Sequence, residues 1–255
     1  MPRRPRTELA GGFHHVVGKS PSGRDLFHDD HDRARYLRLI AREVRKRRWS
    51  VLTFCLMTNH VHVLLCTPAA DLGAGFKTIH EDHARALNDR HGMCGHVFGS
   101  RFYSRLVRND RHLVGCLRYI AQNPVRHGAC RTPRDWPWSA HRALAGLEPA
   151  PAFLDVTSAY SHLGADRNEA RVNYMRLVAQ SDHMLLRDLV RDGSDHWLTG
   201  AIDDYGISVA ELAGFLGISI RTTQRRIASA RDAEGTVPSA SNGAEGTVPF
   251  ASAEG

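Results

Sequence analysis

The sequence predicts an α+β fold, in which a four-stranded antiparallel sheet carries two helices on one face and an all-α region follows it. Two observations lead to this prediction. Over residues 11–108, strand-like and helix-like segments follow one another in the order β-α-β-β-α-β, which is the order of a ferredoxin-like sheet. After residue 150, strand patterns cease and helical spacing continues to about residue 231.

The first strand and the first helix are predicted from residues 11–49. The segment "GGFHHVVGK" (11–19) is typical of a strand. The helix that follows is expected to begin with Asp30 as its N-cap, because a carboxylate there can accept a hydrogen bond from a free backbone N–H. The apolar residues at helical spacing in this segment are Tyr36, Leu37, Ile40 and Val44.

The other elements of the sheet region have equally clear patterns. "WSVLTFCLM" (49–57) and "HVHVLLC" (60–66) predict two strands joined by a Thr-Asn turn. A second helix through "LGAGFKTIHEDHARALNDR" is expected to stop at Gly92. Its apolar stripe consists of Leu72, Phe76, Ile79, His83 and Leu87. The fourth strand is predicted at "HVFGSRFYSRLVR" (96–108).

Two histidines stand out in the third predicted strand. His60 and His62 are two residues apart, so their side chains share one face of the strand. Val61 and Val63 suit the helix-covered side, and the imidazoles would then point to the opposite, free face. Two neutral imidazoles on one face form half of a metal site. The alternative is a half-buried strand with two polar residues that face solvent.

A further helix is predicted after the sheet, from about Asp110 to Pro124. Its apolar stripe consists of Leu113, Cys116, Leu117 and Ile120. Tyr119 and Asn123 are four residues apart and therefore lie one turn apart on one flank of that stripe. The segment "RDWPWSAHRAL" (134–144) is expected to close the domain.

The chain divides into four predicted parts. Residues 1–145 form the sheet domain, and residues 146–165, rich in Pro and Ala at their start, form a linker. Residues 166–232 form a helical region, and the tail 233–255 repeats AEGTVP twice and is expected to be disordered.

A helix-turn-helix is predicted at residues 208–231. Ala213 and Gly217 have the spacing of that motif, in which small residues let two helices cross closely. Thr223 stands where an aliphatic residue is expected. The residues expected to contact DNA from the second helix are Arg221, Gln224 and Arg225. The alternative is an ordinary helical hairpin.

Composition narrows the class of protein. Lys plus Arg number 34 against 27 Asp plus Glu, which gives a net charge of +7 and suits a polyanionic partner without proving one. Nearly all the positive charge is arginine, whose planar fork binds phosphate oxygens in pairs, although a GC-rich genome also favours arginine codons. The five cysteines form no CxxC pair, so neither a disulfide framework nor a zinc ribbon is predicted.

The sequence predicts neither a secretory signal nor a membrane span. The basic start "MPRRPRTELAGG" is not followed by an apolar segment of the kind that secretory signals contain. No stretch approaches the roughly 18 apolar residues of a membrane span. A soluble, intracellular protein is expected.

Five stretches together carry a resemblance to a known family. "GGFHHV", "CLMTNHVHVLL", "GHVFGSRFYSRLV", "LRYIAQNPVRHG" and "DWPWSAHRAL" occur in this order over residues 11–144. In this they resemble the HUH single-strand DNA transposases (IS200-like), and in particular the REP-associated tyrosine transposases of bacteria. Thr58, Gly99 and the segment "GKSPSGRDLF" depart from the family pattern, which bears on DNA contacts more than on the chemistry. The helix-turn-helix lies outside the shared stretch.

The resemblance implies a set of site residues. His60 and His62 would bind a divalent metal, Mg²⁺ or Mn²⁺, and Tyr119 would be the nucleophile. Asn123 would be the third ligand. Gln122 is the alternative, because a residue that precedes proline is biased away from helical geometry.

The resemblance also implies an activity. The predicted protein is a metal-dependent strand transferase and endonuclease, which cleaves and rejoins single-stranded or hairpin DNA through a 5′-phosphotyrosine. The alternative is a non-catalytic regulator that binds hairpin nucleic acid without cutting it. Arg126 is a candidate phosphate contact, and Arg101 and Arg105 are expected to share one face of the fourth strand. Whether two copies of the chain form a homodimer is left open.

Overall fold

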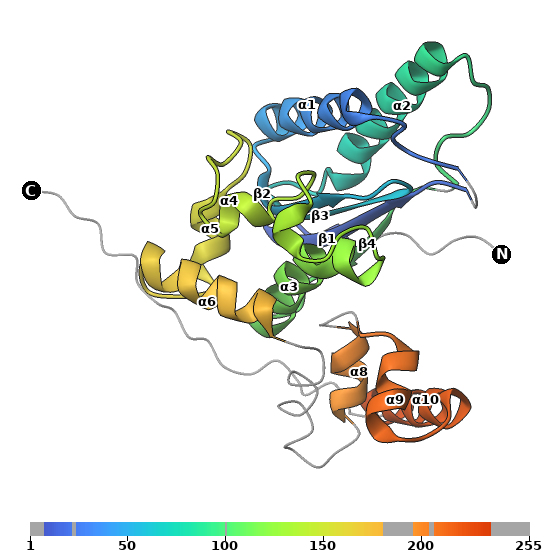
Figure 1. Ribbon diagram of the computed structural model, residues 1–255, viewed down its shortest axis with the longest axis vertical. Helices are drawn as coiled ribbons and strands as arrows, with labels where there is room; N and C mark the ends of the chain where they lie inside the picture. Colours follow the sequence, from blue (N-terminus) through green and yellow to red (C-terminus); the bar gives the residue numbers. More distant parts are fainter. Residues whose placement is uncertain (1–7, 22–23, 100, 181–195, 204–206, 236–255) are drawn as a thin grey trace, which may run out of the picture.

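The structure, a computed structural model, describes residues 8–21, 24–99, 101–180, 196–203 and 207–235. Its centre is a four-stranded antiparallel sheet with the strand order β2-β3-β1-β4. The strands are β1 (Gly12–Lys19), β2 (Ser50–Leu56), β3 (His60–Thr67) and β4 (Tyr103–Leu106). Helices α1 (Asp30–Arg47) and α2 (Leu72–His91) lie on one side of the sheet and α3 (Asp110–Arg126) on the other (Figure 1). The predicted β-α-β-β-α-β order and the fold class are confirmed.

The two helices on the first side begin and end close to the predicted residues. The N-cap of α1 is Asp29 and not Asp30, because Asp29 has extended backbone angles and its carboxylate accepts from the N–H of Asp32. All five residues of the predicted α2 stripe are buried. Helix α2 ends at Gly92, whose φ of 61° is a left-handed conformation that glycine adopts without a Cβ clash.

Strand β4 is much shorter than the predicted strand 96–108 and lies at an edge of the sheet. The described residues before it pack against α2, although the N–H of Gly99 still donates to the carbonyl of Lys19 at the end of β1. Phe98 stacks on His80 with ring centroids 3.8 Å apart, and Val97 and Phe102 are buried. Burial of these apolar side chains against a helix removes the segment from the strand register.

The second side of the sheet was expected to be free, but α3 covers it. The apolar stripe of α3 is buried, and this helix contacts β2 and β3. Asn109 caps its start by accepting from the N–H of His112. The helix does not end at Pro124 but continues to Arg126, because a proline in the last turn removes only one hydrogen bond of the ladder.

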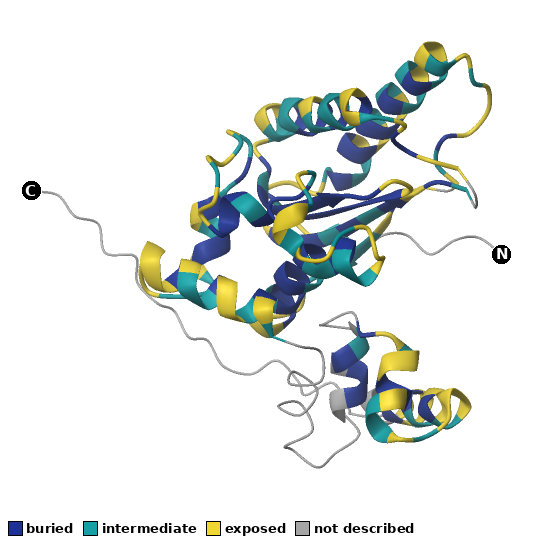
Figure 2. Cartoon of the chain, viewed as in Figure 1, coloured by how far each residue is buried: buried dark blue, intermediate teal, exposed yellow. Residues whose placement is uncertain are grey.

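The main core extends well beyond residue 145. After η1 (Pro133–Asp135) and α4 (His141–Leu144), the chain forms α5 (Val156–Ser161) and α6 (Arg167–Ala179). The buried residues of these last two helices belong to the same core as the sheet, as the dark ribbon segments of Figure 2 illustrate. Leu154 bridges β2 at Val51. The prediction of a linker at 146–165 therefore does not hold, since Leu154 and helix α5 pack on β2.

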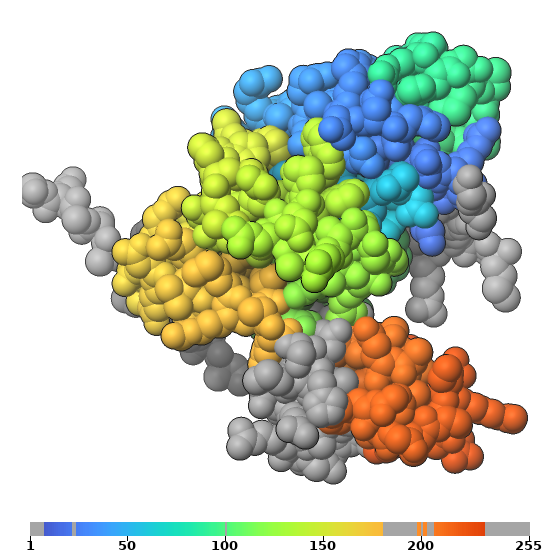
Figure 3. Space-filling model, viewed as in Figure 1, coloured from blue at the N-terminus to red at the C-terminus, as the bar shows by residue number. Residues whose placement is uncertain are grey.

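A second, smaller core lies in the C-terminal helices α8 (His196–Asp203), α9 (Val209–Leu216) and α10 (Ile220–Gly235). Its buried residues are Leu198, Ala201, Ile207, Leu212 and Ile227. Gly217, with a φ of 65°, makes the turn between α9 and α10. Thr223 is fully buried, and its hydroxyl donates to the carbonyl of Ser219 at 3.1 Å, which satisfies the polar group at an expected aliphatic position. In Figure 3 these helices form the orange lobe.

The tail predicted to be disordered begins at residue 233, yet α10 continues through its first residues to Gly235. The rest of the tail lies outside the described residues. Among the helices that the structure describes, none combines the length and the apolar character that a membrane crossing requires.

Candidate metal and tyrosine site

The two histidines of β3 point toward α3. His60 pairs with Lys19 and His62 with Val17 in the antiparallel ladder, so these side chains share the face opposite to α1 and α2. The strand alternation that suggested one face for both imidazoles is present. They do not face solvent, however, because α3 leaves only 9% of His60 and 4% of His62 exposed.

Helix α3 places Tyr119 and Asn123 over these histidines. The ring centroid of Tyr119 lies 5.4 Å from that of His62. Asn123 is fully buried, with its Oδ1 3.0 Å from Nε2 of His60 and its Nδ2 3.2 Å from Nε2 of His62. The side chain of Gln122 instead donates to the carbonyl of Val178. The structure thus brings Asn123, and not Gln122, to the histidines.

The hydrogen bonds around His60 indicate which ring nitrogen carries its proton. Its Nδ1 lies 2.7 Å from Oδ1 of Asn59, an oxygen that can only accept. Burial lowers the pKa of His60, which favours a neutral ring with its single proton on Nδ1. Nε2 then directs a lone pair at Oδ1 of Asn123, and two facing lone pairs suit a shared cation.

His62 supplies a third donor atom to the same place. The amide of Asn123 donates to Nε2 of His62, so this nitrogen also carries a lone pair on the side of the cluster. Burial holds the pKa of His62 well below its usual value, and a metal ligand must be a neutral imidazole. Two imidazole nitrogens and one amide oxygen therefore fit a divalent cation and leave its other positions open.

The site also contains two histidines, His15 and His127, that the sequence did not predict as part of it. Nε2 of His15 on β1 lies 3.0 Å from Nδ1 of His62. The ring of His127, at the end of α3, lies 5.0 Å from that of His60. The register of β1 against β3 could have found His15, but that register depends on residues far apart in the sequence.

Tyr119 is protonated in its present surroundings. Burial raises the pKa of the phenol, while the nearby Arg126 and the hydrogen bond with Asn123 act in the opposite direction. The guanidinium carbon of Arg126 lies 5.6 Å from the centre of the Tyr119 ring. Arg126 also approaches Glu211 of α9, with 3.7 Å between nitrogen and oxygen. The predicted phosphate-binding arginine is thus adjacent to the tyrosine.

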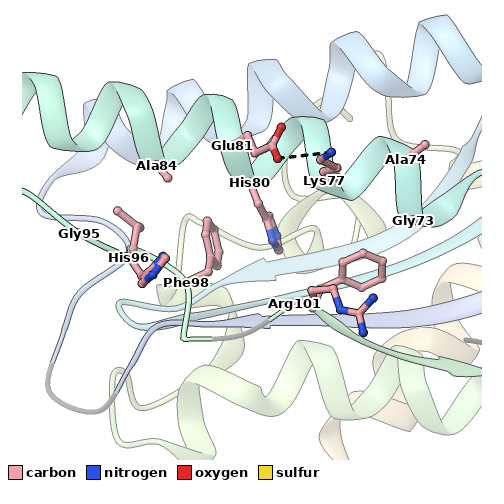
Figure 4. A pocket seen from close by; sticks show the side chains of 12 residues that line it. Gly73, Ala74, Lys77, His80, Glu81, Ala84, Gly95, His96, Phe98 and Arg101 are labelled. Atoms are coloured by element: carbon pink, nitrogen blue, oxygen red, sulfur yellow. Dashed lines mark ion pairs between the residues drawn. The ribbon is translucent and has the colours of Figure 1, made fainter. Parts of the chain in front are cut away.

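The other predicted arginines occupy different surfaces. Arg105 pairs with His15 across β1 and β4 and lies on the histidine face. Arg101 precedes β4 and lines a cavity of about 580 Å³ together with α2 residues such as Lys77 and His80 (Figure 4). The expectation that Arg101 and Arg105 share a strand face is therefore wrong, because β4 begins only at Tyr103.

The three residues predicted to contact DNA from the second helix of the helix-turn-helix lie together on α10. Arg221, Gln224 and Arg225 are all exposed, and their spacing places them on one face within about one helical turn. Their role in DNA binding stays a prediction.

A second group of potential metal ligands lies at the start of α1. Ligand atoms of Asp29, His31 and Asp32 lie within 4.8 Å of one another. Arg90 forms ion pairs with both carboxylates, at 2.5 Å and 2.6 Å. Because side-chain cations already neutralise these oxygens, the group is a weaker candidate than the cluster under α3.

The fold and the cluster together define a class: a ferredoxin-like sheet with a histidine pair beneath a tyrosine-bearing helix. Residues 13–123 match the family described as Transposase IS200 like, a range that contains His60, His62, Tyr119 and Asn123. The resemblance seen in the sequence motifs is confirmed over this part of the chain. The C-terminal helices lie outside it.

Two curated relatives are similar to this chain. A REP-associated tyrosine transposase of Escherichia coli is 29% identical over 119 residues, which cover 44% of this chain and 68% of the relative. A protein of Haemophilus influenzae described as a "Putative REP-associated tyrosine transposase" is 29% identical over 107 residues. That alignment covers 37% of this chain, and the chain spans only 60% of the length of this relative.

A solved structure shares the fold. It is the "Structure of the REP associates tyrosine transposase bound to a REP hairpin", and it superposes with a TM-score of 0.51 at 23% identity. The match covers 61% of this chain and 94% of the solved chain. At this identity, the likeness concerns the fold.

Proposed function

We propose that this protein is a metal-dependent DNA strand transferase and endonuclease, which cleaves and rejoins single-stranded or hairpin DNA through a 5′-phosphotyrosine. The observation that carries the proposal is the position of Tyr119 and Asn123 directly over His60 and His62. These residues come from elements that are about 60 residues apart in sequence, and each contributes a group that phosphoryl transfer requires.

The phenolic oxygen of Tyr119 would attack the scissile phosphorus. The phenol gives up its proton as the bond from tyrosine oxygen to phosphorus forms, the bond from phosphorus to the 3′ oxygen breaks, and the 3′ oxygen takes up a proton and leaves as a hydroxyl. The phosphotyrosine keeps the energy of the broken ester bond. A later attack by a 3′ hydroxyl can therefore rejoin DNA without a nucleotide cofactor.

His60, His62 and Asn123 would hold the divalent cation, Mg²⁺ or Mn²⁺. When bound, the cation supplies charge neutralisation at a phosphate oxygen and so stabilises the transition state. Their burial under α3 fixes the three donor atoms and excludes bulk water from them. Arg126 would bind a phosphate oxygen beside Tyr119 and would favour the phenolate by its charge.

The names of the relatives support transposase-type action on DNA. The REP hairpin bound in the solved structure supports a hairpin as the form of DNA that this chain binds. An action on chromosomal DNA would place the protein in the cytoplasm, at the nucleoid.

The C-terminal helices would add a duplex anchor. Helix α10 presents Arg221, Gln224 and Arg225 on one exposed face, and such a helix can enter a major groove. Attachment to duplex DNA beside the hairpin would raise the local concentration of the single-stranded target at Tyr119.

The test is incubation of the full chain with end-labelled, hairpin-bearing single-stranded DNA and either Mn²⁺ or Mg²⁺, followed by a denaturing gel. A covalent protein–DNA band that disappears with chelator is expected. Tight hairpin binding without such a band, at any metal concentration, would replace the proposal with the non-catalytic regulator.

A further inference from the structure

The ring of His15 lies close to both His62 and Tyr119. On β1 it alternates with His14 and Val16, and the register places it on the side of the sheet that α3 covers. Its ring centroid lies 5.1 Å from that of His62 and 5.9 Å from that of Tyr119. The proposed ligand set does not use this imidazole.

The hydrogen bonds of this cluster indicate which ring nitrogen of His62 and of His15 carries the proton. Because the amide of Asn123 donates to Nε2 of His62, the single proton of neutral His62 is on Nδ1. That N–H points at Nε2 of His15, 3.0 Å away, which must therefore be the acceptor. The proton of neutral His15 is then on Nδ1, toward the sulfur of Cys116 at 4.0 Å.

We propose that His15 is a positioning residue that accepts a hydrogen bond from Nδ1 of His62 and so holds His62 in the tautomer whose Nε2 is unprotonated and can bind a divalent cation. This inference rests on the proposed function of the His60, His62 and Asn123 cluster. A partner on the far nitrogen fixes both the ring orientation and the tautomer of a ligating histidine.

His60 and His62 are then both oriented by a hydrogen bond from Nδ1, although the acceptor differs. Nδ1 of His60 donates to the side-chain oxygen of Asn59, and Nδ1 of His62 donates to the ring nitrogen of His15. Because Nδ1 of His62 carries the proton, Nε2 of His15 supplies the lone pair for this hydrogen bond. With Nε2 engaged by His62, His15 is not itself a ligand.

The test compares two substitutions in the full chain. His15→Gln keeps a side-chain oxygen that can accept from His62, whereas His15→Leu removes the acceptor and keeps an apolar volume. Mn²⁺ affinity by calorimetry is expected to fall about 10- to 100-fold in His15→Leu and to stay within about threefold of wild type in His15→Gln. His14→Leu is the matched control, because the neighbouring imidazole faces the opposite side of the sheet.

A second measurement reports the tautomer without metal. In ¹⁵N NMR spectra of labelled metal-free protein, with His62 assigned by its loss in His62→Ala, wild type and His15→Gln should show a protonated Nδ1. His15→Leu should show a mixture of tautomers. If His15→Leu leaves both the His62 tautomer and the Mn²⁺ affinity unchanged, the proposal is wrong. If His15→Gln loses as much affinity as His62→Ala, His15 is a ligand and the positioning role is also wrong.

These readouts separate the inference from the proposed function. A wild-type protein that binds no Mn²⁺ would contradict the metal site, but the tautomer of His62 would still report on His15. Thermal unfolding of each variant shows whether a loss of affinity is only a loss of folded protein.

Discussion

The two sides of the sheet both carry buried histidines, but their partners differ in kind. On the side of α1 and α2, Nε2 of His80 meets the hydroxyl of Tyr36 at 3.1 Å, and Nε2 of His83 meets the carbonyl of Leu26 at 2.8 Å. Aromatic rings surround both. On the side of α3, His60 and His62 meet the amide of Asn123, and His62 also meets another imidazole.

The difference indicates which histidines serve packing and which are prepared for chemistry. A hydroxyl or a carbonyl satisfies one ring nitrogen of a neutral imidazole without a cation, although Nδ1 of His83 is buried without a hydrogen-bond partner. A lone pair that faces another acceptor is incomplete until a cation joins both. Histidines on the two sides of the sheet are therefore distinguished by their hydrogen-bond partners and not by residue type.

The largest effect is expected at the nucleophile on the α3 side. Tyr119→Phe should abolish the covalent DNA adduct, because only the hydroxyl is lost while the ring keeps its packing against His62. Hairpin affinity, measured by fluorescence anisotropy, should stay nearly unchanged. Tyr103→Phe is the control, since Tyr103 is 63% exposed on the edge strand. Equal adduct from Tyr119→Phe, with loss in Tyr103→Phe, would move the nucleophile to β4.

The next effect contrasts one histidine from each side. His62→Ala should remove Mn²⁺ binding and lower the cleavage rate by at least about 10³-fold, since a bound cation contributes several kcal/mol to the transition state. His83→Ala should leave Mn²⁺ affinity intact but lower the free energy of unfolding by about 1–3 kcal/mol, because it leaves the carbonyl of Leu26 without a partner. Undiminished Mn²⁺ binding after combined replacement of His60 and His62 would contradict the metal site.

Because His62 is buried, His62→Ala should lower the free energy of unfolding more than the same substitution at an exposed position. Unfolding by denaturant must therefore accompany the metal titration, so that only folded protein is compared.

A smaller effect is expected from pH, through a histidine of the packing type. His141 is buried against Tyr174, with its Nδ1 3.1 Å from the hydroxyl, and burial lowers its pKa to about 4. In the unfolded chain, His141 binds a proton at about pH 6.5. The contribution of neutral His141 to the free energy of unfolding is therefore complete above that pH and is lost as pH falls toward 4. The loss for one such residue is about 3 kcal/mol.

The measurement is urea unfolding at several pH values between 7 and 4. His141→Gln, which can still hydrogen-bond Tyr174, should reduce the slope of stability against pH over this window. An identical slope in wild type and variant would mean that His141 does not bind its proton on unfolding as expected.

The smallest effect is expected from the C-terminal helices. Combined Ala replacement of Arg221, Gln224 and Arg225 should weaken binding to hairpins with long duplex flanks about tenfold and reduce the salt slope by about 2. Cleavage of a short hairpin should not change. Arg176→Ala, at an exposed position of α6, is the control for a general loss of positive charge.

A truncation that tests the same idea must keep the whole main core. The buried side chains of that core continue to Val178, so the chain should end at residue 180 and not near residue 150. An unchanged ratio of affinities for flanked and unflanked DNA, in the truncated chain and in the triple variant, would leave these helices without a role as an anchor.

Local periodicity by itself determined much of this protein. Side chains alternate along a strand, so the spacing of His60 and His62 was enough to place both on one face. Helical spacing placed Tyr119 and Asn123 on one flank of α3, although Pro124 wrongly suggested that the helix stops there. These are relations between residues that are close in sequence, and backbone geometry alone dictates them.

The tertiary structure decided what lies opposite each face. It placed α3 over the histidines, put His15 beside His62, separated Arg101 from Arg105, and buried Leu154 where a linker was expected. Each of these depends on strand register or on packing between segments far apart in the chain. A local pattern specifies that a face is apolar or polar, but the partner that covers it is selected by the packing of the whole core.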